Sequence, residues 1–197
     1  MLRKIWILIF CVALIWSGIN PHDYFTWFLE VVPALIGVAI LYKTEKSFPL
    51  TSLVYNLILV HAIILMIGGH YTYAEVPFFN TLQEMFDLSR NNYDKVGHFA
   101  QGFVPAMIAR EIFRRKKIIN SKSWENFLIV SLSLSCSAFY ELIEWWVALS
   151  SGESAEAFLG TQGYIWDTQS DMGIALLGAI VALISLSKTH NKQLEKV

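Results

Sequence analysis

Three pairs of titratable residues occur at helical spacing in the sequence: Asp94 with His98, Glu141 with Glu144, and Asp167 with Asp171. Residues three or four apart lie on one face of a helix, so each pair directs both side chains the same way. Carboxylate oxygens suit Mg²⁺ and Mn²⁺, and imidazole nitrogens also suit Zn²⁺. The six residues are therefore predicted to be ligands of a divalent metal, either Mg, Mn or Zn.

The two glutamates need a partner more than the other residues do. Glu141 and Glu144 lie near the C-terminal end of a predicted helix, where the helix dipole disfavours negative charge. An ionised side chain within a membrane span costs about 2.5 kcal/mol or more. A proton, a metal ion, a substrate cation or a basic side chain must compensate, and we favour the metal. Both glutamates are candidate catalytic residues, together with His70, a candidate acid or base at the end of another predicted helix.

Several of these residues also have structural explanations. Asp94 and Asp167 begin predicted helices, where an aspartate can cap free backbone amides. His70 and His98 could be hydrogen-bonded packing residues. The glutamates could be protonated, or could line a hydrated cavity.

Long apolar segments must position these residues. The chain has 197 residues, of which 55% are hydrophobic and only 16% charged, whereas a soluble domain carries about 25% charged residues. A membrane-spanning helix needs about 20 mainly apolar residues. The fold class predicted is all-α: one polytopic membrane helix bundle over residues 1–197. Six spans are predicted, at 4–20, 27–43, 50–69, 94–113, 126–148 and 168–187.

The distribution of basic residues predicts the topology. With six spans, every Lys and Arg except Arg90 and Lys95 falls on one side, which the positive-inside rule assigns to the cytoplasm together with both termini. The three titratable pairs then lie at outer helix ends, where few basic residues are available. The basic run 114–117 is interpreted as a topology determinant that contacts anionic lipid. A net charge of −1 argues against nucleic acid as a partner.

The longest outer connection contains an amphipathic segment at 78–88. Its apolar residues recur at helical spacing, which predicts a short helix. This helix either lies on the outer membrane interface or covers the bundle as a lid.

Four stretches resemble the YjdF family of bacterial inner-membrane proteins: GGHYTYAEVP at 68–77, DKVGHFAQG at 94–102, YELIEWW at 140–146 and GTQGYIWDTQSD at 160–171. The resemblance covers essentially the whole chain. It implies a bacterial multi-pass inner-membrane protein and no particular activity. The titratable pairs also resemble, more distantly, the pattern of VanZ-like membrane proteins, although the loop before Asp167 is longer here and lacks the arginine usual in that family.

Three functions fit these features. The leading hypothesis is a metal-dependent enzyme that acts on a membrane lipid or lipid-linked substrate at the outer, periplasmic face. The alternatives are a small transporter or cation- or proton-binding protein using the same carboxylates, and a non-enzymatic accessory protein whose carboxylates hold helices together. Polar residues become fewer toward the cytoplasmic side, which favours a one-sided site over a conduction path.

Overall fold

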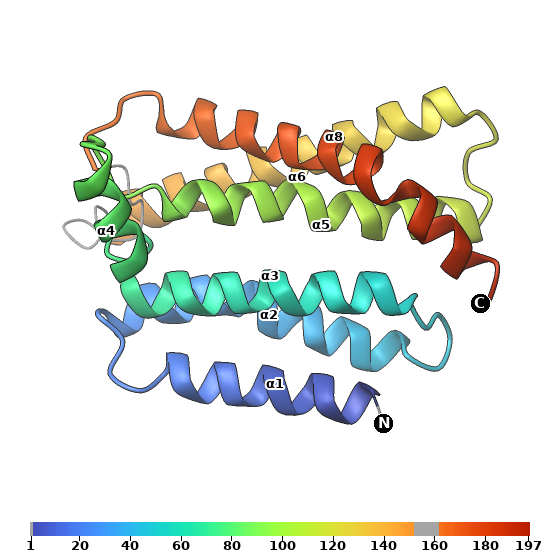
Figure 1. Cartoon of the computed structure of the whole chain (residues 1–197), viewed down its shortest axis with the longest axis horizontal. Coiled ribbons are helices and arrows are strands. Elements are labelled where there is room, and N and C mark those ends of the chain that lie inside the picture. The colour runs from blue at the N-terminus through green and yellow to red at the C-terminus, as the bar shows by residue number, and fades with distance from the viewer. Residues whose placement is uncertain (1, 152–161) are drawn as a thin grey trace.

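A computed structural model describes residues 2–151 and 162–197, and these form seven helices and no strand. The helices are α1 (Leu2–Ser17), α2 (Tyr24–Thr44), α3 (Ser52–Tyr71), α4 (Pro77–Met85), α5 (Tyr93–Arg115), α6 (Lys122–Ser151) and α8 (Asp167–Leu194). All the helices except α4 are long and run roughly alongside one another, and the short α4 lies across one end (Figure 1). The fold is therefore an all-helical bundle, as the sequence predicts.

The bundle has two halves joined through α3 and α5. Helices α1 and α2 pack on α3, and α6 and α8 pack on α5 and on each other. Both termini lie at one end of the bundle with the connections 45–51 and 116–121, which we call the termini end (Figure 1). Helix α4 and the connection 18–23 lie at the opposite end, the α4 end. The N-terminal ends of α2, α5 and α8 are therefore all at the α4 end.

Each of the six predicted spans falls on one of the long helices. Among the described residues, α2, α3, α6 and α8 are long and apolar enough to cross a membrane. Helix α1 is apolar but shorter, and α5 carries polar residues along its length. Length and composition thus identify four candidate membrane spans among the described residues.

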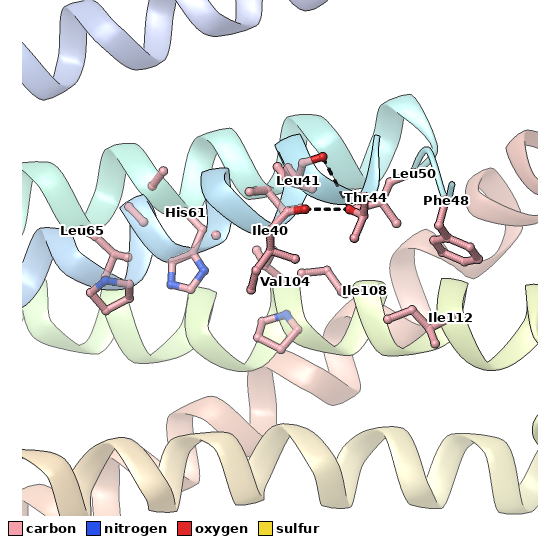
Figure 2. Close-up of a pocket in the computed structure, with 16 residues that line it drawn as sticks. Ile40, Leu41, Thr44, Phe48, Leu50, His61, Leu65, Val104, Ile108 and Ile112 are labelled. Atoms are coloured by element: carbon pink, nitrogen blue, oxygen red, sulfur yellow. Dashed lines mark hydrogen bonds between the residues drawn. The ribbon is translucent and has the colours of Figure 1, made fainter. Parts of the chain in front are cut away.

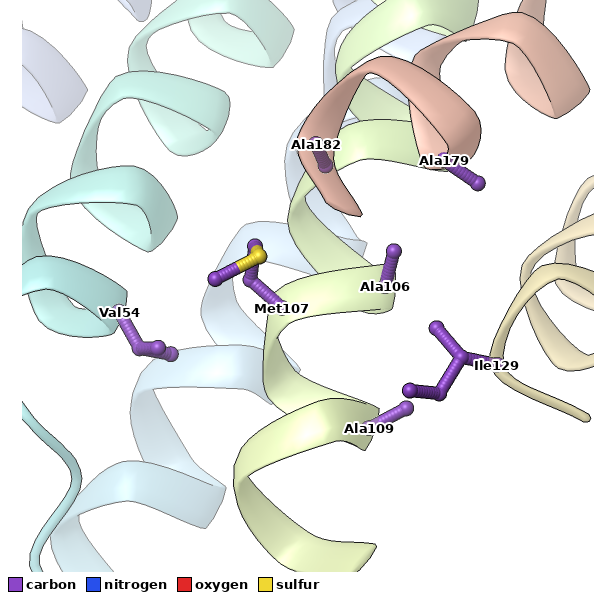
Figure 3. Packing of buried hydrophobic residues seen from close by; sticks show 7 residues of the cluster. All are labelled: Val54, Ala106, Met107, Ala109, Ile129, Ala179 and Ala182. Atoms are coloured by element: carbon purple, nitrogen blue, oxygen red, sulfur yellow. The ribbon is translucent and has the colours of Figure 1, made fainter. Parts of the chain in front are cut away.

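Small side chains allow α5 and α8 to approach closely. Ala106 and Ala109 of α5 are buried with Ala179 and Ala182 of α8, and Figure 3 shows this cluster beside Ile129 of α6. In lipid, helices pack mainly through such close contacts, because lipid tails are as apolar as the side chains they would replace. Large apolar side chains instead lie on the outside of the bundle, where lipid would surround them.

Two glycines fix the position of α5 against α8. A Cβ atom on Gly102 would lie 1.7 Å from the carbonyl oxygen of Ala175, and one on Gly178 would lie 2.2 Å from the carbonyl oxygen of Phe99. These distances are far below van der Waals contact, so no larger residue fits without moving a backbone. The contact holds the first turns of both helices at one level.

Helix α4 is shorter than the predicted segment 78–88. It ends at Met85 because Asp87 adopts a positive φ of 50° and the amide of Leu88 donates to the carbonyl of Gln83 at 2.9 Å. The ring of Phe79 packs edge-on against Tyr93 of α5, with centroids 5.2 Å apart. Helix α4 thus rests on the bundle by this face.

The termini end contains a buried polar network. Glu111 of α5 accepts hydrogen bonds from the backbone amide and hydroxyl of Thr51, at 2.8 and 2.7 Å. Its Oε2 also lies 3.0 Å from Nε2 of His190, whose Nδ1 is 2.8 Å from Arg110 Nη1. All four side chains are buried. The network joins α3, α5 and α8.

The arginines and the lysines of the basic run 114–117 have different surroundings. Arg114 bonds Glu125 at 2.6 Å, and Arg115 bonds Glu111 at 2.9 Å. Lys116 and Lys117 are exposed, and the two arginines are partly buried. The interpretation of the run as a topology determinant that contacts anionic lipid stays a prediction.

Candidate functional site

Lys95 lies at the centre of the acidic cluster at the α4 end. Its Nζ is 2.5 Å from Asp171 Oδ1, 3.1 Å from Asp167 Oδ1 and 2.8 Å from Ser170 Oγ. Lys95 begins α5 and its three partners begin α8, so these contacts follow from the close crossing of the two helices. One ammonium group thus bridges both aspartates of α8.

Arg90 is the second basic residue of the cluster. It lies just before α5, is buried, and forms a direct ion pair with Asp167. Its Nη2 also lies 3.6 Å from Asp94 Oδ2. Sequence analysis identified Arg90 and Lys95 as the two basic residues on this side but did not place them in the site. The three aspartates therefore have basic partners, whereas compensation of Glu141 and Glu144 by a cation stays a prediction.

Asp94 and Asp167 form no side-chain cap bond, although both lie in a first turn, where negative charge complements the helix dipole. The N-cap residues of α5 and α8 are Asn92 and Trp166, and neither helix has a side-chain cap bond. Asp167 is the first residue of α8 and Asp94 the second residue of α5, so both lie in the first turn. Their carboxylates are therefore turned toward the ion-pair cluster.

His98 connects this cluster to the interior of the bundle. Its Nε2 is 3.2 Å from Asp94 Oδ1 and 3.9 Å from Asp171 Oδ2, and its Nδ1 is 3.1 Å from Gln101 Oε1. Ligand atoms of Asp94, His98 and Asp171 all lie within 4.8 Å of one another. A single divalent ion with ligand distances of about 2.0–2.6 Å can bridge atoms at this spacing.

Glu141 of α6 faces the same histidine. Its side chain is buried, with 8% exposed, and its Oε1 lies 3.8 Å from His98 Nδ1. Among the described residues this oxygen has no hydrogen-bond partner, and neither has the buried hydroxyl of Ser137 one turn deeper. A buried polar atom without a partner is costly, so this position is suited to a bound ligand.

A small cavity of about 110 Å³ opens beside the cluster. Its polar lining residues are Glu30, His61, Tyr73, Asp94, His98, Gln101, Tyr140 and Glu144. Glu144 thus joins the site through this cavity. The structure brings together all six predicted metal ligands, although Asp167 is already paired with two basic side chains.

Two residues of the cavity were missed by sequence analysis. Glu30 of α2 is buried, and the hydroxyl of Tyr140 donates to its Oε2 at 3.1 Å. A lone carboxylate within the apolar segment 27–43 was the signal that could have revealed it. His61 of α3 also lines the cavity, but an isolated histidine in an apolar segment gives no comparable signal.

His70, the predicted acid or base, lies elsewhere. Its Nδ1 is 3.0 Å from the carbonyl oxygen of Ser17, and its ring packs on Trp16 at 4.7 Å between centroids. It therefore faces α1. Within the described part of the chain, the α3 imidazole that lines the cavity is His61 and not His70.

The chain matches, over residues 2–192, the family model described as predicted membrane protein (DUF2238). It belongs to this family. It is also 52% identical over 185 residues to inner membrane protein YjdF of Escherichia coli (strain K12), covering 94% of this chain and 88% of that protein. No solved structure matches.

This membership confirms the resemblance to YjdF proteins that the four stretches indicate. With the apolar helices, it shows a multi-pass inner-membrane protein embedded in the lipid bilayer. Of the fourth stretch, residues 160 and 161 lie outside the described residues. The resemblance to VanZ-like proteins stays a prediction.

Proposed function

We propose that this DUF2238 protein is a membrane-embedded enzyme that uses a divalent cation to act on a lipid or lipid-linked substrate at the outer face. The observation that carries the proposal is the unpartnered Oε1 of Glu141 beside His98. This oxygen is buried in a bundle, where an ionised carboxylate is expensive without a cation. Ligand atoms of Asp94, His98 and Asp171 lie within 4.8 Å of one another, a spacing that one ion can bridge, and Glu141 adjoins this group through His98 at 3.8 Å.

The residues of the site take different roles in this proposal. Asp94, His98, Asp171 and Glu141 hold the cation, and Glu144 acts as acid or base from the cavity wall. A divalent ion in such a site lowers the pKa of bound water and polarises a phosphoryl or carbonyl group. Asp167 is the exception among the predicted ligands: it positions Lys95 through their 3.1 Å contact.

The proposal includes a topology. All six long helices cross the membrane, both termini are cytoplasmic, and the α4 end faces the periplasm, as the positive-inside rule indicates. Helix α5 can cross despite its polar residues because α3, α6 and α8 pack around it. Intramembrane ionisable residues are normally directed into the bundle in this way.

A one-sided enzyme fits better than a transporter. A polar transport path between α5 and α8 would have to continue to the termini end, where Glu111 and His190 are fully buried in the polar network. That network is held together by Arg110 and Thr51. Its closed packing supports a site that opens toward one face.

Metal analysis of the detergent-purified protein tests the proposal. We expect about one Mn²⁺ or Zn²⁺ per chain in the wild type and at least tenfold weaker binding in Glu141→Gln, which keeps the shape of the side chain. Glu84→Gln, on the exposed face of α4, is the matched control and should bind as the wild type does. Wild-type protein that binds no divalent metal would refute the proposal.

A further inference from the structure

An apolar groove of about 350 Å³ lies between α2, α3 and α5. Figure 2 shows Ile40 of α2, Leu65 of α3 and Val104 of α5 on its walls. The hydroxyl of Thr44 donates to the carbonyl of Ile40 at 2.8 Å and is satisfied within its own helix. Apart from His61, the walls therefore present hydrocarbon, and the volume lies in the range of about 300–1,000 Å³ found for small-molecule sites.

The groove is formed by the helices themselves. Pro33 in α2 and Pro105 in α5 both line it, and a proline inside a helix removes a backbone hydrogen bond and bends the helix. Gly37, between Pro33 and Thr44 on α2, contributes no side chain. A Cβ atom placed on Gly37 would meet no atom within 4 Å. Two prolines and a glycine within the helices therefore account for the open space of the groove.

The length of the groove matches a hydrocarbon chain. Pro33 and Thr44 both line it, and they are about 17 Å apart along α2 at a rise of about 1.5 Å per residue. One leaflet of a bilayer with a core of about 30 Å is about 15 Å thick, which is the space one lipid chain occupies. A single chain can therefore lie along the groove.

One end of the groove adjoins the acidic cavity. Pro33, His61 and Leu65 line both spaces. The cavity of about 110 Å³ is smaller than the groove of about 350 Å³ and is lined by polar side chains, so it suits a compact polar head group such as a phosphate. Since carboxylates line the cavity, an anionic group enters only together with a cation.

We infer that the substrate is a lipid phosphate whose single hydrocarbon chain lies in the groove and whose phosphate is held in the cavity by the divalent cation. The inference rests on the proposed function, because the cation held by residues such as Asp94 and His98, which also line the cavity, would neutralise the phosphate. The chain would leave the cavity past His61 and follow α2 toward Thr44.

Native mass spectrometry of the protein in neutral detergent tests this inference, with dodecyl phosphate as probe and Mn²⁺ as cation. We expect one probe per chain with Mn²⁺ and at least tenfold weaker binding without it. Gly37→Trp fills the groove, so it should retain Mn²⁺ and bind the probe at least tenfold more weakly. Gly173→Trp, at another glycine with open space around it, should bind both as the wild type does.

The outcomes separate the two proposals. Probe binding that survives Gly37→Trp, or that does not depend on Mn²⁺, overturns the lipid-phosphate inference and leaves the metal site standing. Failure of the wild type to bind Mn²⁺ overturns the proposed function itself. If Gly37→Trp does not fold, the smaller Gly37→Leu provides the same comparison.

Discussion

Lys95 and Asp171 form a direct ion pair inside the helix bundle, with Nζ 2.5 Å from Oδ1. The pair joins the first turns of α5 and α8, and Asp171 is almost fully buried. A buried charge such as that of Asp171 is retained only where it has a partner. The basic residue that the sequence places at an outer helix end is therefore part of the candidate site.

Replacing Lys95 should destabilise the protein strongly. Lys95→Met keeps the length of the side chain but leaves Asp167 and Asp171 without their shared cation, at a cost of about 3 kcal/mol. Thermal unfolding in detergent measures the effect. Lys188→Met, at an exposed position of α8, should change the melting temperature little, and equal melting temperatures for the two variants would contradict the pairing.

Gly102→Ala should separate α5 from α8. The added Cβ would lie 1.7 Å from the carbonyl oxygen of Ala175, so the helices must move apart, at a cost of about 1–3 kcal/mol or more. We expect a lower melting temperature together with weaker binding of Mn²⁺. Gly173→Ala has open space for its methyl group and serves as control. A Gly102→Ala protein with wild-type stability would show that the helices are not in backbone contact.

The polar network at the termini end should be structural only. His190→Ala removes the imidazole that lies between Glu111 Oε2 and Arg110 Nη1. Glu111 keeps Thr51 and Arg115 as partners and Arg110 keeps Asn191, so the cost is that of lost hydrogen bonds between buried groups, about 1–3 kcal/mol. Melting temperature should fall while each folded molecule still binds Mn²⁺ with wild-type affinity. Lower metal affinity in folded His190→Ala would instead connect this network to the candidate site.

Reporter fusions test the topology. Fusions after residues 45 and 118 and at the C-terminus should read as cytoplasmic, since these positions lie at the termini end with most basic residues. A fusion at residue 80, in α4, should read as periplasmic. A second external position, residue 155, lies outside the described residues and should give the same result as residue 80. A cytoplasmic reading at residue 80 would place the candidate site on the cytoplasmic side of the membrane and contradict the proposed topology.

Much of this architecture can be predicted from the sequence because the signals are local. Apolar runs of sufficient length determine where helices form, and all six predicted spans fall on long helices. Spacing along one helix determines which side chains share a face, so Asp94 with His98 and Asp167 with Asp171 were predicted as pairs. The two pairs were also predicted to lie at the same end of the bundle, because consecutive membrane-spanning helices alternate in direction.

The tertiary structure decided which groups meet. Rotation of each helix about its axis depends on contacts with other helices, such as that of Gly102 with Ala175, and no local pattern reports it. This rotation turns Lys95 into the aspartate cluster and directs His70 toward α1. It also brings Glu30 and His61 from two other helices into the cavity. Sequence alone determined the elements and their faces, whereas packing between distant segments determined the site, because side chains on separate helices become neighbours only when the helices pack.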